Sequence, residues 1–185
     1  TVTQAAGKVG NAAQFTAANS EFLSIADNAA LSGSDRDIYI ASWVYLDSAA
    51  LRAIVSKYGA AGNREYILWV DTSTLKADIS GDGTAVTSFA GGAGLVTTGA
   101  WHFVEMYHDS VNNLIGISLN RAADTTAAHT TGVFNGTNAF KLGGNDGGLN
   151  YWDGRMDAFG FWDKIPTTAE RDELYNDSSG KEHPF

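Results

Sequence analysis

The chain has 185 residues, a formal net charge of −9 and no cysteine. Without cysteine there are no disulfides and no thiol chemistry, and 12 basic residues scattered along an acidic chain argue against a nucleic-acid partner. No run of about 18 apolar residues is present, so we expect no membrane insertion. A chain of this length buries roughly 70% of its unfolded surface, enough for one self-supporting core, and we predict a single domain over residues 1–185.

Short stretches of alternating apolar and polar residues dominate the chain. In order they are residues 21–26, 37–47, 51–58, 65–71, 74–80, 101–109, 113–120, 139–142 and 155–163. Alternation of period two between Gly, Asn and Asp turns is typical of β-strands. The Ala-, Gly- and Thr-rich stretches 84–100 and 122–136 are predicted to be irregular strands and long loops. The sequence therefore predicts an all-β fold, an antiparallel β-sandwich or barrel.

One short helix is predicted near the C-terminus. Thr167 and Glu170 have the spacing of a capping box, in which each side chain binds the backbone amide of the other residue. Leu174 and Tyr175 give this helix an apolar edge. We expect two or three turns that cover part of the sandwich.

Parity assigns the side chains of two long strands to opposite faces. In residues 37–47, aliphatic side chains such as Ile40 and Val44 alternate with aromatic ones. In residues 101–109 a carboxylate falls among the aromatics, and an unpaired carboxylate is costly in a core, so this set is placed on an open outer face. The expected open face carries Tyr39, Trp43, Tyr45, Phe103, Glu105 and Tyr107.

These six residues are a candidate carbohydrate-binding site. Flat aromatic rings stack on the apolar faces of sugars, while polar side chains bind the hydroxyls. The alternative is that loops cover the aromatic residues, or that the aromatic residues only stabilise the sheet, because such residues are enriched in strands.

An ordered series of segments resembles a known family. The series opens with residues 7–15 (GKVGNAAQF) and 21–25 (EFLSI), continues with 40–44 (IASWV), 54–59 (IVSKYG) and 99–104 (GAWHFV), and closes with 153–157 (DGRMD), 161–163 and the helix 167–176. It is similar to laminin-G-like and pentraxin-like domains of the concanavalin A-like lectin/glucanase group, over about residues 7–180. The resemblance implies a jelly roll of two curved antiparallel sheets. It implies no activity, because this fold hosts lectins, hydrolases, lyases, adhesins and virion components.

The residues do not favour an enzyme. A retaining glucanase of this fold needs two carboxylates about 5–5.5 Å apart, and the acid that follows Glu105 is Asp109, near the strand end. Tyr107 and His108 are adjacent, so they point to opposite faces and cannot jointly serve one sugar as a lyase pair. We expect no catalytic residues.

Metal sites are weakly indicated. His102, His108, His129 and His183 show no zinc-ligand spacing. Residues 78–83 faintly resemble an EF-hand loop, but a hairpin turn at Asp82-Gly83 explains them better. The resemblance implies a structural Ca²⁺, with Asp157 at the position of the matching carboxylate. The alternative is that Asp157 pairs with Arg155 or with a turn amide.

Two functions remain open. The first is a non-catalytic, lectin-like adhesin domain that recognises a glycan, polysaccharide or host surface in an extracellular or cell-surface location. The second, suggested by the bacterial surface and bacteriophage structural proteins in which such domains occur, is a virion structural protein. Such a capsid decoration or tail protein would lie at the virion surface, with capsid or tail proteins as partners. A polysaccharide-degrading enzyme is the less favoured third possibility.

Overall fold

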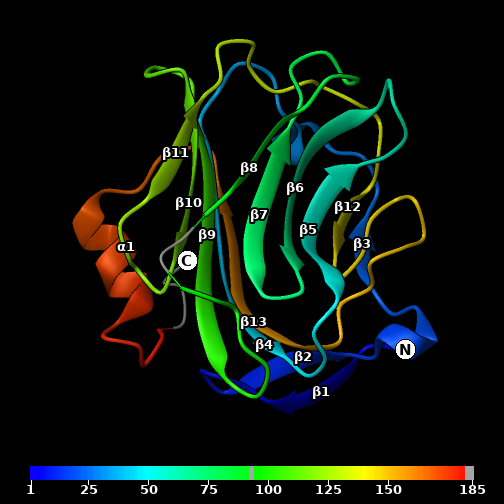
Figure 1. Cartoon of the computed structure of the whole chain (residues 1–185), viewed down its shortest axis with the longest axis vertical. Coiled ribbons are helices and arrows are strands. Elements are labelled where there is room, and N and C mark those ends of the chain that lie inside the picture. Colours follow the sequence, from blue (N-terminus) through cyan, green and yellow to red (C-terminus); the bar gives the residue numbers. More distant parts are fainter. Residues whose placement is uncertain (92–93, 182–185) are drawn as a thin grey trace.

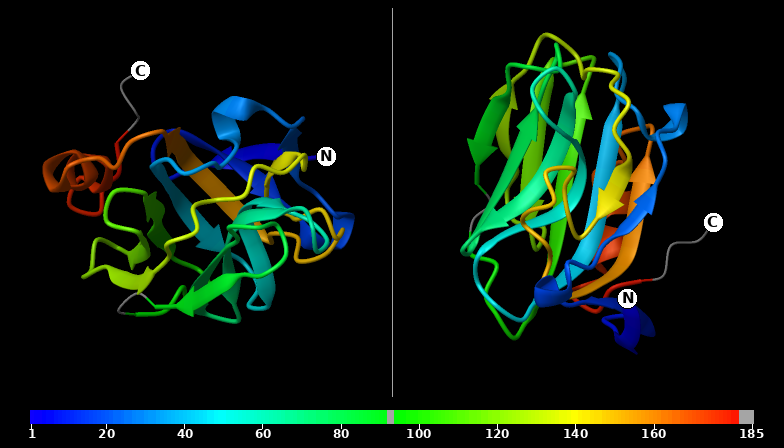
Figure 2. Two further views of the ribbon diagram at one scale, coloured as in Figure 1. Left: turned by 90° about the horizontal axis from the view of Figure 1, so that it is seen from above. Right: turned by 90° about the vertical axis from the view of Figure 1, so that its right-hand side faces the viewer.

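A computed structural model describes residues 1–91 and 94–181. Two antiparallel sheets lie face to face as two layers (Figures 1 and 2), which confirms the predicted all-β sandwich. The seven-stranded sheet has the order β1 (Thr3–Ala6), β2 (Asn11–Phe15), β13 (Gly154–Trp162), β4 (Ile38–Leu46), β9 (Trp101–Asp109), β10 (Leu114–Leu119) and β11 (Thr125–Ala128). The six-stranded sheet has the order β3 (Leu23–Ile25), β12 (Phe140–Leu142), β5 (Leu51–Tyr58), β6 (Arg64–Asp71), β7 (Thr74–Ile79) and β8 (Thr87–Ala90).

Each of the nine segments with clear alternation forms a strand. β8 and β11, of four residues each, lie in the stretches predicted to be irregular. Two short 3₁₀ turns, η1 (Ala17–Asn19) and η2 (Ala29–Leu31), flank β3. No helix within the described residues is long and apolar enough to cross a membrane.

The main core lies between the two sheets and follows the predicted parity. Ile40, Val44, Val104 and Met106 of the seven-stranded sheet are at most 1% exposed and pack in one cluster with residues of the other sheet, such as Leu68. Burial of each such side chain stabilises the fold by about 1.5–3 kcal/mol relative to exposure. The aliphatic flanks of both sheets therefore hold the sandwich together.

Helix α1 (Thr168–Tyr175) lies outside the seven-stranded sheet, beside β9, β10 and β11 at the left of Figure 1. Its N-terminus has the predicted capping box: Thr167 accepts from the amide of Glu170, and the Glu170 carboxylate accepts from the amide of Thr167 at 2.7 Å. The two reciprocal bonds satisfy amides that a helix start would otherwise leave free. The helix therefore begins where the sequence predicts.

A buried ion pair joins the ends of β5 and β6. Lys57 and Glu65 are both fully buried and in direct contact, and Glu65 also accepts from the amides of Gly33 at 2.8 Å and Gly136 at 2.9 Å. Burial raises the pKa of Glu65, while Lys57 and the two amides oppose this rise. These bonds supply the partners that a buried carboxylate requires.

Candidate functional site

The predicted aromatic platform shares one face, but this face is not open. Tyr39, Trp43 and Phe103 are at most 1% exposed, and Tyr107 is 7% exposed. They form a second apolar cluster with Leu174 of α1, and the ring of Tyr175 stacks on Trp43 with centroids 5.6 Å apart and planes within 10°. The parity assignment is thus confirmed, whereas the expected open sugar platform is wrong, because helix α1 covers it.

Glu105 binds the helix and is not available to a ligand. It is fully buried, and its Oε1 accepts from Arg171 Nε at 2.8 Å and from the Tyr39 hydroxyl at 2.5 Å. Arg121 approaches its Oε2 at 3.3 Å. Burial and the Glu105 charge raise the pKa of Tyr39. The sequence could have revealed this role. Arg171 lies three residues before Leu174 and four before Tyr175, so it shares the apolar face of the predicted helix.

Arg171 extends the network to a second acid. Its Nη1 and Nη2 donate to the two oxygens of Asp124, each at 2.9 Å, and Asp124 also accepts from the Tyr107 hydroxyl at 2.9 Å. Burial acts to raise the pKa of Asp124, but the bonds and charge of Arg171 outweigh it and lower that pKa. The carboxylate and phenol groups of the predicted platform therefore bind one another or Arg171 and Asp124, whereas the indole Nε1 of Trp43 is buried without a partner in the described residues. Tyr45 alone of the six residues is half-buried and lies outside this cluster.

Asp157 is engaged by backbone amides. Its Oδ2 accepts from Val9 N and its Oδ1 from Ala158 N, both at 2.7 Å. Positively polarised amide hydrogens occupy the sides from which a cation would be bound, and no group of three or more His, Asp or Glu suited to a metal occurs within the described residues. These residues do not fit a Ca²⁺ site, so Ca²⁺ at Asp157 stays a prediction without support from this geometry.

The outer face of the six-stranded sheet has a different character. Cross-strand partners point to the same face, and pairing places Ser56, Ile67, Asp78 and Ser88 in one row across β5 to β8. The next row holds Ala53, Trp69, Lys76 and Ala90. A groove of about 230 Å³, called the outer groove here, opens over these rows. It is lined by Trp69, Lys76, Asp78, Ser88, Phe89 and Ala90.

Two polar atoms at the outer groove have no hydrogen-bond partner in the described residues. They are the indole Nε1 of Trp69, a donor, and Oδ1 of Asp78, an acceptor. Asp78 is 9% exposed, and burial raises its pKa against the opposing effects of Ser88, Lys76 and Arg64. A buried polar atom without a partner costs about 1–3 kcal/mol. Two side chains that line the outer groove thus carry an unmatched donor and an unmatched acceptor, both of them buried.

Charged and aromatic side chains border the outer groove. The Lys76 ammonium lies 5.4 Å from the Trp69 ring centroid and pairs with Asp71 at 2.7 Å. Arg64 lies over the Tyr58 ring at 5.5 Å, and the pKa of Tyr58 is raised by burial and by the charge of Asp78. Both cations and carboxylates therefore lie near this face.

The loop after β12 flanks the same sheet on its β5 side. Gly144 O accepts from Ser56 at 2.8 Å, and Lys141 pairs with Asp146 at 2.5 Å. Tyr151 at the loop end stacks on Phe22 with ring centroids 6.2 Å apart. The loop therefore contacts the outer face at Ser56.

Comparison with known proteins decides the family. Residues 16–170 match the family model described as the concanavalin A-like lectin/glucanases superfamily. The chain belongs to this superfamily. No curated protein sequence matches it.

Several solved structures share this concanavalin A-like fold. The binding domain of Paraclostridial Mosquitocidal Protein 1 has a TM-score of 0.77 and 12% identity over 96% of this chain, which spans 46% of that structure. Domain 4 of AbnA, an extracellular arabinanase from Geobacillus stearothermophilus in complex with arabinotriose, has a TM-score of 0.64 and 17% identity over 98% of this chain and 82% of its own. The CBM40 of the Ruminococcus gnavus IT-sialidase, bound to alpha2,3 sialyllactose, has a TM-score of 0.61 and 17% identity over 73% of this chain and 80% of its own. At these identities the likeness shows a shared fold.

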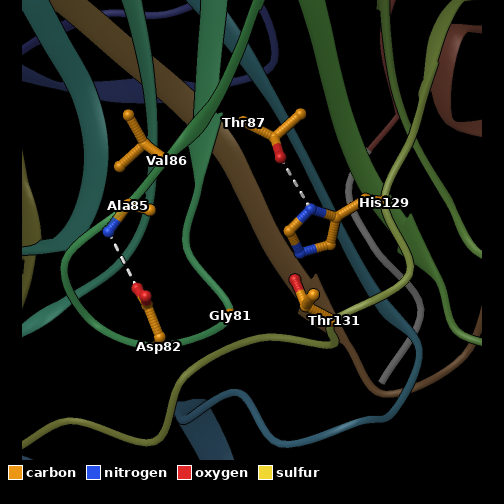
Figure 3. Close-up of a pocket in the computed structure, with 7 residues that line it drawn as sticks. All are labelled: Gly81, Asp82, Ala85, Val86, Thr87, His129 and Thr131. Carbon is orange, nitrogen blue, oxygen red and sulfur yellow. Dashed lines mark hydrogen bonds between the residues drawn. The ribbon is translucent and has the colours of Figure 1, made fainter.

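A second cavity of the concanavalin A-like sandwich, of about 380 Å³, lies between the loop after β7 and the segment after β11 (Figure 3). His129 Nδ1 lies 2.9 Å from the Thr87 hydroxyl, and its Nε2 lies 2.5 Å from Gly132 O. Asp82 Oδ1 accepts from the amides of Thr84 and Ala85 at 2.8 Å each, as expected of a turn and not of an EF-hand. Both ring nitrogens of His129 are engaged, so this cavity offers a ligand less than the outer groove.

The other histidines also have backbone or loop contacts. His102 Nε2 accepts from the amide of Thr97 at 3.1 Å, and His108 Nδ1 lies 2.7 Å from Arg36 O. His183 lies outside the described residues.

Proposed function

We propose that this chain is a non-catalytic carbohydrate-binding module and that its outer groove binds a glycan. The observation that carries the proposal is the pair of unmatched polar atoms, Trp69 Nε1 and Asp78 Oδ1, in side chains that line one groove. Both atoms are buried in this structure, so a sugar hydroxyl, which both donates and accepts hydrogen bonds, complements this pair once the side chains that line the groove shift slightly.

The half-buried Trp69 ring supplies the apolar partner. Aromatic rings give large contact area at low conformational cost, and hydrogen bonds to a charged group contribute about 1.5–3 kcal/mol. A groove of about 230 Å³ is smaller than most drug-sized pockets. We therefore expect weak binding, with a Kd on the order of 1 mM or somewhat below.

The comparisons support a glycan as the ligand class, because two similar structures are named as complexes with arabinotriose and sialyllactose. An extracellular or cell-surface location accords with this role, and the arabinanase is named as extracellular. The virion role stays a prediction.

A glycan array followed by calorimetry with the best oligosaccharide tests the proposal. We expect Trp69→Ala to weaken binding of a neutral oligosaccharide at least about tenfold, through loss of the ring contact. Asp78→Asn should weaken it as well, because the amide offers a weaker acceptor.

Two matched variants control for general effects. Trp162→Ala removes a half-buried indole from the other sheet, and Asp163→Asn removes an exposed carboxylate. Neither should change the affinity more than about twofold. Equal binding by the wild type and Trp69→Ala, or a loss in Trp162→Ala as large as that in Trp69→Ala, would overturn the proposal.

A further inference from the structure

The outer face of the seven-stranded sheet continues beyond helix α1. There, pairing aligns Arg155 of β13, Tyr45 of β4 and Trp101 of β9 in one row. All three side chains are half-buried, and Tyr45 and Trp101 meet edge to face with ring centroids 5.5 Å apart. We call these three residues the arginine row. Of these three residues, Tyr45 belongs to the predicted aromatic face, and Arg155 and Trp101 extend that face beyond the helix.

Arg155 is held in a fixed orientation by this row. Its guanidinium carbon lies 3.8 Å from the Tyr45 ring centroid and 5.3 Å from that of Trp101. Its Nη1 donates to Ala6 O at 3.0 Å. Stacking on aromatic rings orients a guanidinium plane and leaves its edge free to bind.

The free edge of Arg155 has no partner within the described residues. No hydrogen bond from Nε or Nη2 and no carboxylate within 4.0 Å of the guanidinium is found there, although the chain carries 21 acidic residues. Asp157, two residues along on the same strand, binds the amides of Val9 and Ala158 instead. By contrast, Arg171 on the same face binds two carboxylates. Arg155 is therefore a positioned but unpaired cation.

We propose that the arginine row is a second binding site, which takes the oxyanion of an acidic sugar, either a carboxylate or a sulfate ester. Nε–H and Nη2–H lie along one edge of a guanidinium, in the geometry that binds two oxygens of one oxyanion. The Trp101 indole beside them provides a flat surface for the sugar ring. This site lies on the opposite sheet from the outer groove and does not depend on the glycan binding proposed there.

The first test uses tetragalacturonate, which carries carboxylates, and its methyl ester, which has the same rings without charge. We expect calorimetry to show binding of the acid that weakens as salt is added, and at least about tenfold weaker binding of the ester. Arg155→Gln should bind the acid at least about tenfold more weakly than the wild type does. Arg155→Lys keeps the charge without the planar fork, so its affinity for the acid should lie between those of the wild type and Arg155→Gln. A comparison of dextran sulfate with uncharged dextran tests sulfate esters in the same way. The preferred oxyanion is the one whose affinity falls more in Arg155→Gln.

Lys164→Gln is the matched control, because it removes one exposed positive charge from another part of the chain. It should bind the acid within about twofold of the wild type, and all variants should keep the thermal midpoint and near-ultraviolet spectrum of the wild type. Equal binding of acid and ester, or equal losses in Arg155→Gln and Lys164→Gln, would overturn the second site.

Trp69→Ala separates this inference from the proposed function. If the second site exists, Trp69→Ala binds tetragalacturonate normally and shifts of the Trp101 indole N–H resonance persist on titration. If Trp69→Ala loses the acid while Arg155→Gln keeps it, the acidic ligand belongs to the outer groove and the second site is refuted.

Discussion

The two outer faces of the sandwich treat their buried carboxylates in opposite ways. On the seven-stranded sheet, Glu105, Arg171 and Asp124 bind one another and the hydroxyls of Tyr39 and Tyr107 under helix α1. On the six-stranded sheet, Asp78 and Trp69 each keep one buried polar atom without a partner in the described residues. On the covered face the charged and phenol groups have partners, although the indole Nε1 of Trp43 is also buried without one among the residues that the structure describes. On the six-stranded sheet the unmatched atoms belong to side chains that line a groove, where a ligand can relieve their cost.

The largest loss in the free energy of unfolding is expected from Arg171→Ala. Removal of this guanidinium leaves the fully buried Glu105 with the Tyr39 hydroxyl and the weaker Arg121 contact, and removal of one partner of a buried ion pair costs about 3–5 kcal/mol. Chemical denaturation should show this loss, and the freed aromatic face should bind an apolar dye. As a control, Lys164→Ala breaks the exposed pair with Glu170 and should cost at most about 1 kcal/mol. A loss below about 1 kcal/mol for Arg171→Ala would mean that the helix is not held by this network.

A smaller effect is expected from Thr167→Ala. The variant removes one bond of the capping box, and loss of such a cap costs about 1 kcal/mol. The same denaturation experiment measures this value, and Thr167→Ser serves as the control that keeps the acceptor. A cost above about 3 kcal/mol would indicate that Thr167 does more than cap α1.

On the six-stranded face, removal of a buried charge should have the opposite effect on the free energy of unfolding. Asp78→Asn removes the charge from a buried carboxylate that has an unmatched oxygen, so we expect unchanged stability or a gain of up to about 1 kcal/mol. Loss of glycan binding in the same variant would show that Asp78 serves a ligand and not the fold. A destabilisation like that of Arg171→Ala would remove the contrast between the faces.

The pH dependence of stability gives the finest test. The folded pKa of Asp124 lies below its ordinary value of 3.8, because Arg171 outweighs burial, so its contribution is present above pH 3.8 and is lost as pH falls through the folded pKa. The folded pKa of Asp78 lies above 3.8 because of burial, so its contribution is present below pH 3.8 and is lost as pH rises through the folded pKa. Relative to the wild type, the Asp124→Asn and Asp78→Asn stability curves should therefore diverge in opposite directions as pH rises from about 3. Parallel curves would contradict the opposite environments of the two acids.

The arrangement of the candidate sites was less accessible to prediction than the strands. The alternation in residues 37–47 and 101–109 correctly separated Ile40 and Val44 from Tyr39 and Trp43, since strand geometry alone sets the faces. The same alternation placed Trp69, Lys76 and Asp78 on neighbouring strands without showing that they meet, because pairing register joins residues from separate segments.

By itself, the sequence determined the local features of this protein: the strands, the sides of β4 and β9 that face the core, and the capped start of α1 at Thr167. These depend on backbone geometry and on contacts between residues close in the chain. Only the tertiary structure decided which outer face stays uncovered, because that depends on where Arg171 and Tyr175 come to lie against Glu105 and Trp43, far away in the sequence. For that reason the predicted sugar platform lies under a helix, while the outer groove and the arginine row emerged from the packed sheets.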